Sequence, residues 1–124
     1  MRISPTGSAS RLNIPYTTHN DSPVVDPDIL RLMFNTVNRV TRSGKVLGVD
    51  QQATPLEALA SVTINAAYQY HEEDHKGSIT AGKLADLVIL SDNPLTIDKA
   101  KIGDIKVLET FKQGQSVYRN TEEI

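Results

Sequence analysis

The chain has 124 residues, of which 39% are apolar and 23% are charged, so it is long enough to bury a modest core and is not a disordered tail. Its 13 Lys and Arg residues are scattered among 15 Asp and Glu residues, giving a net charge of −2, which excludes the basic patch typical of a nucleic-acid partner. Cysteine is absent and no run approaches the roughly 18 apolar residues of a membrane span, so disulfides, thiolate metal sites and membrane helices are excluded. We therefore expect a soluble, unexported and cytoplasmic protein.

The first 25 residues have the least regular pattern. Residues 13–18 favour a short strand, because Tyr16 and two threonines suit a pleated surface and Pro15 is tolerated at a strand's start. Residues 19–23, which end in proline, predict a turn or loop.

A first helix is predicted over residues 27–41. Asp26 can cap its free amides, and Pro27 suits the first helical position. A single apolar stripe recurs at helical spacing: Leu30, Met33, Val37 and Val40. Residues 42–53, with two glycines, interrupt this pattern and should form a loop.

A second helix is predicted from Thr54 to about Tyr70. The sequence TPLE is a capping box, in which Thr54 and Glu57 can each bond the other's backbone amide. One face of this helix is expected to pack inward: Leu56, Leu59, Thr63, Ala66 and Tyr70.

Strands and turns follow the second helix. Residues 87–90 form a short apolar run rich in β-branched side chains, which predicts a strand buried on both faces. Residues 105–111 and 115–118 flank Gln113-Gly114 and predict a hairpin. The fold class is therefore α+β, in the order strand, two helices and about three strands.

Three stretches of the chain carry a family resemblance. They are HNDSPV at residues 19–24, the helical stretches LRLMFNTVNRVTRSGKVLG and TPLEALASVTINAAYQ, and GSITAGKLADLVILSDNPL at residues 77–95. Together they resemble the amidohydrolase superfamily, in particular the group that includes N-substituted formamide deformylases and exoenzyme regulatory proteins. The resemblance implies the C-terminal fragment of such an enzyme. Residues 1–75 would be strand 8 and the terminal helices of a TIM barrel, and residues 76–124 would be strands of a small composite β-sandwich domain.

The resemblance also implies a site. Asp21 matches the family's aspartate at the end of the eighth strand, which is a metal ligand and a general base, and His19 is a candidate second ligand. The alternative for Asp21 is a turn residue before Pro23 that bonds backbone amides, and for His19 a polar loop residue. The family's HxH pair and its other metal-binding strands have no counterpart in this sequence. The implied cofactor is a divalent metal, zinc above all, in the full-length parent, with none expected in the isolated chain.

Two functions remain open. The first is metal-dependent hydrolysis of a carbon–nitrogen bond other than a peptide bond, on a small amide-type substrate, with this chain inactive alone. The alternative is a non-catalytic binding or regulatory module built on the same scaffold. In either case we expect no nucleic-acid or membrane partner, and self-association through exposed helix faces or a sheet edge.

Several other polar residues have mainly structural interpretations. Arg39 is either near the active-site mouth, as the resemblance implies, or a partner in a salt bridge. The His-rich residues 71–75 predict a solvated helix end rather than a metal site. Asp86 is expected to cap a turn by accepting backbone amides, because its charge is costly to bury unpaired. Gly77 and Gly82 should shape that turn, and Lys83 should face solvent or a carboxylate.

Overall fold

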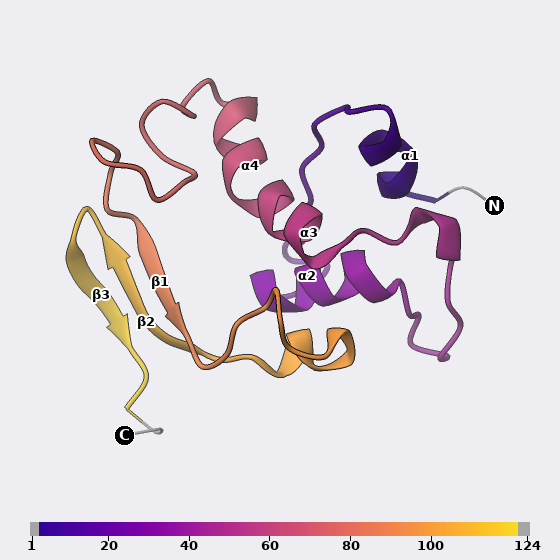
Figure 1. Ribbon diagram of the computed structural model, residues 1–124. Coiled ribbons are helices and arrows are strands. Elements are labelled where there is room, and N and C mark those ends of the chain that lie inside the picture. The colour runs from indigo at the N-terminus through magenta and orange to yellow at the C-terminus, as the bar shows by residue number, and fades with distance from the viewer. Residues whose placement is uncertain (1–2, 122–124) are drawn as a thin grey trace.

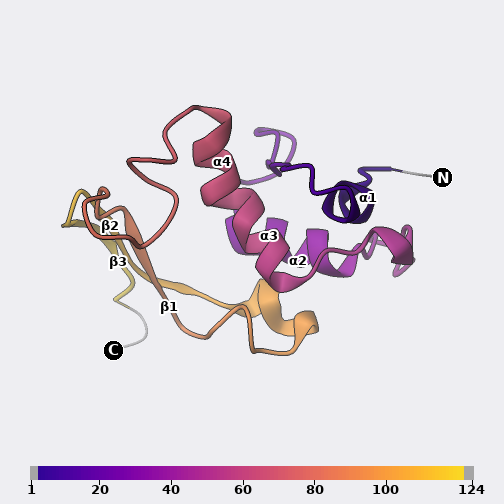
Figure 2. The ribbon, with the colours of Figure 1, turned by 45° about the horizontal axis from the view of Figure 1, so that its top comes forward.

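The computed structural model describes residues 3–121, in which helices form one body and a small sheet lies beside it (Figure 1). The elements in chain order are α1 (Thr6–Arg11), α2 (Ile29–Asn38), the 3-10 helix η1 (Val49–Gln51), α3 (Pro55–Val62), α4 (Ile64–Gln69), β1 (Leu87–Leu90), the 3-10 helix η2 (Lys99–Asp104), β2 (Val107–Lys112) and β3 (Gln115–Arg119). The turned view of Figure 2 shows the same separation between the strands and α1. None of the helices within residues 3–121 has the length and apolar character needed to cross a bilayer.

The start of the chain differs from the prediction in two ways. A helix, α1, forms where no helix was predicted, and residues 14–20 belong to no strand. The prediction of a strand over residues 13–18 is wrong because no other strand within residues 3–121 pairs with this segment. Side chains attach it to α3 and α4 instead. Thr17 Oγ1 donates to Gln69 Oε1 at 2.8 Å, and the Thr18 and Ser61 hydroxyls are 2.9 Å apart.

Helix α2 confirms most of the first helical prediction. It begins at Ile29 rather than residue 27, because the Asp28 carboxylate, and not Asp26, accepts the first free amide, from Arg31 at 2.9 Å. Leu30, Met33 and Val37 are buried as predicted. Val40 is 40% exposed because the helix ends at Asn38, before the stripe reaches it.

The second predicted helix is two helices, α3 and α4. The capping box at Thr54 and Glu57 is confirmed. Thr63, however, has φ −125° and ψ −96°, which interrupts the helix between Val62 and Ile64. The predicted inward face is confirmed in part: Leu59 packs against the core, whereas Leu56 and Tyr70 are 64% and 75% exposed.

The buried side chains of α3 and α4 are small ones that were not predicted to face inward. They are Ala58, Ser61 and Ala67, with exposed fractions of 0%, 0% and 6%. Because these side chains are small, α3 can approach α2 closely. The central cluster joins α2, α3 and η2 through Met33, Val37, Ala58 and Ile102. This small core fixes the helical body and leaves many larger apolar side chains outside it.

The sheet has three antiparallel strands in the order β1-β2-β3. The predicted hairpin is confirmed, with φ of 50° at Gln113 and 79° at Gly114, as a tight turn between twisted strands requires. The strand at residues 87–90 is also confirmed. Its predicted burial on both faces is wrong, because Leu87, Val88 and Ile89 are 39%, 51% and 47% exposed. Among residues 3–121, β1 is an edge strand with a neighbour on one side only.

The turn that leads into β1 has the predicted chemistry. The Asp86 carboxylate accepts the backbone amide of Gln113, at 2.8 Å from Oδ1 to N. Gly77 and Gly82 have φ of 86° and 92°, in the left-handed region that glycine tolerates best. These residues are structural, as expected.

Candidate functional site

Asp21 lies in the loop between the extended residues 14–20 and α2. Its φ is 58°, and its carbonyl accepts the Val24 amide at 2.9 Å, which closes a tight turn over residues 21–24. Asn20 Nδ2 donates to the Asp28 carbonyl at 3.1 Å, so the loop is tied to the start of α2. The Asp21 side chain is exposed. The backbone of Asp21 therefore shapes the turn, while its carboxylate remains accessible.

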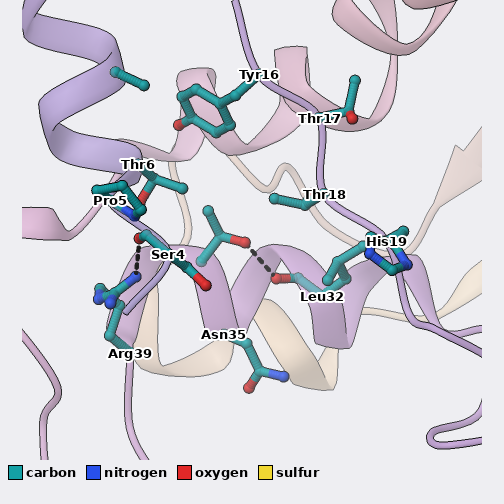
Figure 3. A pocket seen from close by; sticks show the side chains of 12 residues that line it. Ser4, Pro5, Thr6, Tyr16, Thr17, Thr18, His19, Leu32, Asn35 and Arg39 are labelled. Carbon is teal, nitrogen blue, oxygen red and sulfur yellow. Dashed lines mark hydrogen bonds between the residues drawn. The ribbon is translucent and has the colours of Figure 1, made fainter. Parts of the chain in front are cut away.

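His19 borders a groove of about 540 Å³ (Figure 3). One wall is the start of α1, the facing wall is residues 16–19, and part of the lining comes from α2. The residues that surround it are Ser4, Pro5, Thr6, Ala9, Tyr16, Thr17, Thr18, His19, Leu32, Asn35, Thr36 and Arg39. Asp21 is not among them. The two predicted metal ligands are thus close in sequence, but only His19 reaches the groove.

Arg39 lines this groove from the end of α2. Its Nε donates to the Leu47 carbonyl at 2.6 Å, and its Nη1 donates to the Ser4 carbonyl at 3.0 Å. Nη2 also donates to the Ile3 carbonyl. Within residues 3–121 Arg39 has no salt bridge: its donors bind carbonyl oxygens and hold the N-terminal segment against α2.

Tyr16 is a groove residue that sequence reasoning did not select. Burial raises the pKa of Tyr16 above its ordinary value of 10.0, so the phenol keeps its proton at neutral pH. Asn65 Nδ2 donates to the Tyr16 carbonyl at 3.0 Å and fixes this part of the extended segment to α4. The only signal in the sequence was its position, three residues before His19.

The His-rich residues 71–75 form the polar turn after α4, as predicted. His71 is exposed with φ 58°, and Lys76 pairs with Glu72 at 2.8 Å. The expectation of a solvent or carboxylate partner for Lys83 is wrong. Its Nζ donates to the Ser78 hydroxyl at 2.8 Å and to the carbonyl of Glu73, so the cation stabilises the loop before β1.

The donor set for a metal is incomplete in the part of the chain that the structure describes. An imidazole and a carboxylate are both suitable donors for zinc, and His19 and Asp21 supply one each. Within residues 3–121, no three or more His, Cys, Asp or Glu residues gather in a group that could hold a metal ion. A zinc ion takes about four ligands. His19 and Asp21 alone are therefore too few to complete a zinc site.

Comparisons of this chain with known proteins agree on one family. The sequence pattern of the Amidohydrolase family matches residues 2–118. The chain is 29% identical over 121 residues to an N-substituted formamide deformylase of Arthrobacter pascens, a match that covers 98% of this chain and 22% of that protein. It is 37% identical over 62 residues to an imidazolonepropionase of Streptococcus pyogenes, covering 50% of this chain and 15% of that protein. The chain thus spans about a fifth or less of the length of these relatives.

A solved structure agrees at the level of the fold. An amidohydrolase from Thermotoga maritima superposes on 93% of this chain and 34% of its own length, with a TM-score of 0.50 and 21% identity. The match of the family pattern extends from before α1 to within β3, so both the helices and the sheet are included. This chain belongs to the amidohydrolase family.

Proposed function

We propose that this chain is the C-terminal portion of a metal-dependent hydrolase that acts on carbon–nitrogen bonds other than peptide bonds. The observation that carries the proposal is the family match over residues 2–118. The name of the Arthrobacter relative denotes removal of a formyl group from an N-substituted formamide, and that relative matches 98% of this chain. We therefore assign an N-substituted formamide or a similar small amide as the substrate class.

The order of helices and strands along the chain supports a division of this C-terminal portion into two parts. The helices α1–α4 lie between residues 6 and 69, and all three strands lie between residues 87 and 119. We assign residues 1–75 to the end of a TIM barrel and residues 76–124 to the composite β-domain. Asp86 and its turn lie just after that boundary.

Asp21 is the proposed catalytic residue of this portion. Its carboxylate is exposed on an ordered turn, where it can accept a proton from water and return it to the leaving nitrogen. When bound, a divalent metal such as zinc would lower the pKa of water and polarise the carbonyl. Asp21 and His19 would each supply one donor, and residues outside this chain would supply the remainder. On this proposal the isolated chain holds no metal tightly and is inactive.

A chimaeric enzyme tests this proposal directly. The part of the Arthrobacter deformylase that matches this chain is replaced by residues 1–121, and deformylation of an N-substituted formamide is assayed with zinc present. We expect measurable turnover, and we expect Asp21→Asn to reduce it by about 100-fold or more, because an amide cannot act as a base at neutral pH. Asp26→Asn, an exposed carboxylate five residues later, is the matched control and should leave turnover unchanged.

Two results would contradict parts of the proposal. An active chimaera that keeps its rate with Asp21→Asn would exclude Asp21 as the base. Hydrolysis by the 124-residue chain alone, lost on Asp21→Ala, would show that the isolated chain is a complete enzyme. A well-folded chimaera without any activity would instead favour the non-catalytic binding module.

A further inference from the structure

The backbone that carries His19 and Asp21 is anchored by the residues on either side of His19. Thr18 and Asn20 are half-buried, whereas His19 and Asp21 are exposed. Thr18 contacts α3 and Asn20 contacts the start of α2. The side chains that hold this segment are therefore distinct from the two that are proposed to bind the metal.

Thr18 attaches the segment to a buried part of α3. Its hydroxyl is 2.9 Å from the hydroxyl of Ser61, which is 0% exposed. Ser61 Oγ donates its single hydrogen to the Ala58 carbonyl at 2.7 Å, so Thr18 Oγ1 is the donor to Ser61. A core side chain thus sets the position of Thr18.

Asn20 attaches the segment to the first turn of α2. Its Nδ2 donates to the Asp28 carbonyl at 3.1 Å. The same carbonyl accepts the Leu32 amide at 3.1 Å, and the Asp28 carboxylate caps the helix by accepting the Arg31 amide. A carbonyl oxygen has two lone pairs and can accept both donors. The Asn20 side chain is therefore bound to an atom whose position α2 fixes.

The turn after Asn20 is closed by bonds within itself. The Val24 amide donates to the Asp21 carbonyl at 2.9 Å, and Ser22 Oγ donates to the Val25 carbonyl at 3.0 Å. These bonds give the turn its shape, but they do not fix its place relative to the helices, because both partners of each bond belong to the loop. Asn20 supplies a link from this turn to α2.

We propose that Asn20 is a positioning residue for Asp21, whose carboxylate it keeps at a constant place relative to α2 through the hydrogen bond to the Asp28 carbonyl. This role rests on the proposed function of Asp21 as the base. The Asp21 side chain is exposed, so its place depends on the backbone that carries it. Proton transfer requires hydrogen-bond distance, and a displacement of about 1 Å is enough to slow a reaction strongly.

Kinetics of the chimaeric deformylase that contains residues 1–121 tests this role. Asn20→Ala should lower kcat by about 10- to 100-fold and change KM by less than about twofold, because the base is displaced while the substrate still binds. In the Asp21→Asn background, Asn20→Ala should have no further effect on kcat, since it acts through Asp21. Asn38→Ala is the matched control. Asn38 Nδ2 also donates to a carbonyl, that of Lys99 at 2.9 Å, and its loss should leave kcat unchanged.

NMR relaxation of the 124-residue chain gives a second measurement that needs no turnover. The order parameter of the Asp21 amide should be about 0.85 in the original chain and in Asn38→Ala, and it should fall below about 0.6 in Asn20→Ala. The amides of α2 should keep high order parameters in both variants, which separates release of the turn from loss of folding.

The outcomes distinguish this role from the proposed function. A chimaera that keeps its kcat with Asn20→Ala but loses it with Asp21→Asn overturns the role of Asn20 and leaves the proposed function intact. Equal losses of kcat in Asn20→Ala and Asn38→Ala also overturn it, because the cause would then be a general loosening of α2. An unchanged order parameter of Asp21 in Asn20→Ala overturns it without reference to activity. Turnover that survives Asp21→Asn contradicts the proposed base itself.

Discussion

The Asp86 carboxylate is bound to the backbone amide of Gln113, with 2.8 Å between Oδ1 and N. This hydrogen bond joins the entrance of β1 to the turn between β2 and β3. The Gly114 amide donates to the Ala85 carbonyl at 2.9 Å and completes the link. Two residues separated by 27 positions thus set where β1 begins along the hairpin.

We expect Asp86→Ala to lower the free energy of unfolding by about 1 kcal/mol, the typical net value of one intramolecular hydrogen bond. Urea denaturation followed by circular dichroism measures this change. Asp86→Asn is the matched control, because it keeps an acceptor oxygen in the same place and should retain most of the stability. An Asp86→Ala protein as stable as the original chain would show that this hydrogen bond does not hold the strand.

The lowered pKa of Glu57 should make the fold less stable in acid. The hydrogen bond from the Thr54 backbone amide, together with the Ser10 and Thr54 hydroxyls, holds the pKa of Glu57 below its ordinary value of 4.5. Because the folded pKa is lowered, the capping box stabilises the fold above pH 4.5 and loses this effect as pH falls through the lower, folded value. Glu57→Gln should therefore unfold with a weaker dependence on pH in this acid range.

A titration followed by NMR identifies the source of that effect. In Thr54→Ala the pKa of Glu57 should rise toward 4.5 because a hydroxyl donor is lost, and the free energy of unfolding should fall by about 1 kcal/mol. The pKa of Glu109 is also lowered, by Ser116 and Arg119, so it serves as an internal control and should not move. An unchanged Glu57 pKa in this variant would contradict the hydrogen bond that the Thr54 hydroxyl donates to the carboxylate.

Local chemistry made much of the fold predictable. The capping box at Thr54 and the turn at Gln113-Gly114 each depend on residues within three positions of each other, so short sequence patterns identify them. Asp86 was predicted to cap a turn because a buried charge is costly; it does accept a backbone amide, that of Gln113, but its side chain is exposed. The capping box and the turn were predictable because their partners are close in sequence. The partner of Asp86, which is 27 positions away, was not.

Predictions failed where the answer depended on distant parts of the chain. The sequence TGSASR has no apolar stripe, and α1 forms against η1, where Thr6 Oγ1 donates to the Gln51 carbonyl at 2.7 Å and Gln51 Oε1 accepts the Ser8 amide at 2.8 Å. A strand at residues 13–18 needs a pairing strand, which residues 3–121 do not provide. Burial of β1 needs an element on each face. Periodicity cannot reveal such partners.

The candidate site was predictable only in part, for a related reason. Residue chemistry and family resemblance single out Asp21 and His19, but neither gives the position of a side chain relative to the groove. The carbonyl partners of Arg39 could not be foreseen, because every residue has a carbonyl and sequence does not mark which ones accept. Metal ligation by Asp21 and His19 stays a prediction.

Alanine variants of Gly77 and Gly82 allow the cost of backbone strain to be measured apart from the cost of steric crowding. At Gly77, with φ 86°, an added Cβ would lie 2.7 Å from the Ala67 Cβ and 3.0 Å from the Ile64 Cα, so α4 or the turn must move. Gly82 has a similar φ of 92°, with no atom within 4 Å of such a Cβ. We expect Gly82→Ala to cost about 1 kcal/mol from backbone strain alone. Gly77→Ala should cost about 2–4 kcal/mol because overpacking adds to that strain.

Thermal and urea unfolding of the two glycine variants give the comparison. Equal losses in Gly77→Ala and Gly82→Ala would mean that the contact between the turn and α4 yields without cost. A larger loss at Gly82 would contradict the open surroundings of that residue.

The hydrogen bonds of Arg39 should determine how firmly the N-terminal segment is held. Its guanidinium reaches carbonyls of Leu47 and Ser4 from two different nitrogens, which a single ammonium cannot reproduce. Arg39→Lys keeps the positive charge. Lys also has a Cβ and an unbranched stem, so the backbone strain at φ 54° is unchanged and only the multiple hydrogen bonding is lost. We expect faster hydrogen exchange in α1 and a loss of about 1–2 kcal/mol in the free energy of unfolding. Arg42→Lys, at an exposed loop position, is the control, and exchange in α1 that is equally slow in both variants would show that the contacts with Asp50 and Gln51 hold α1 without Arg39.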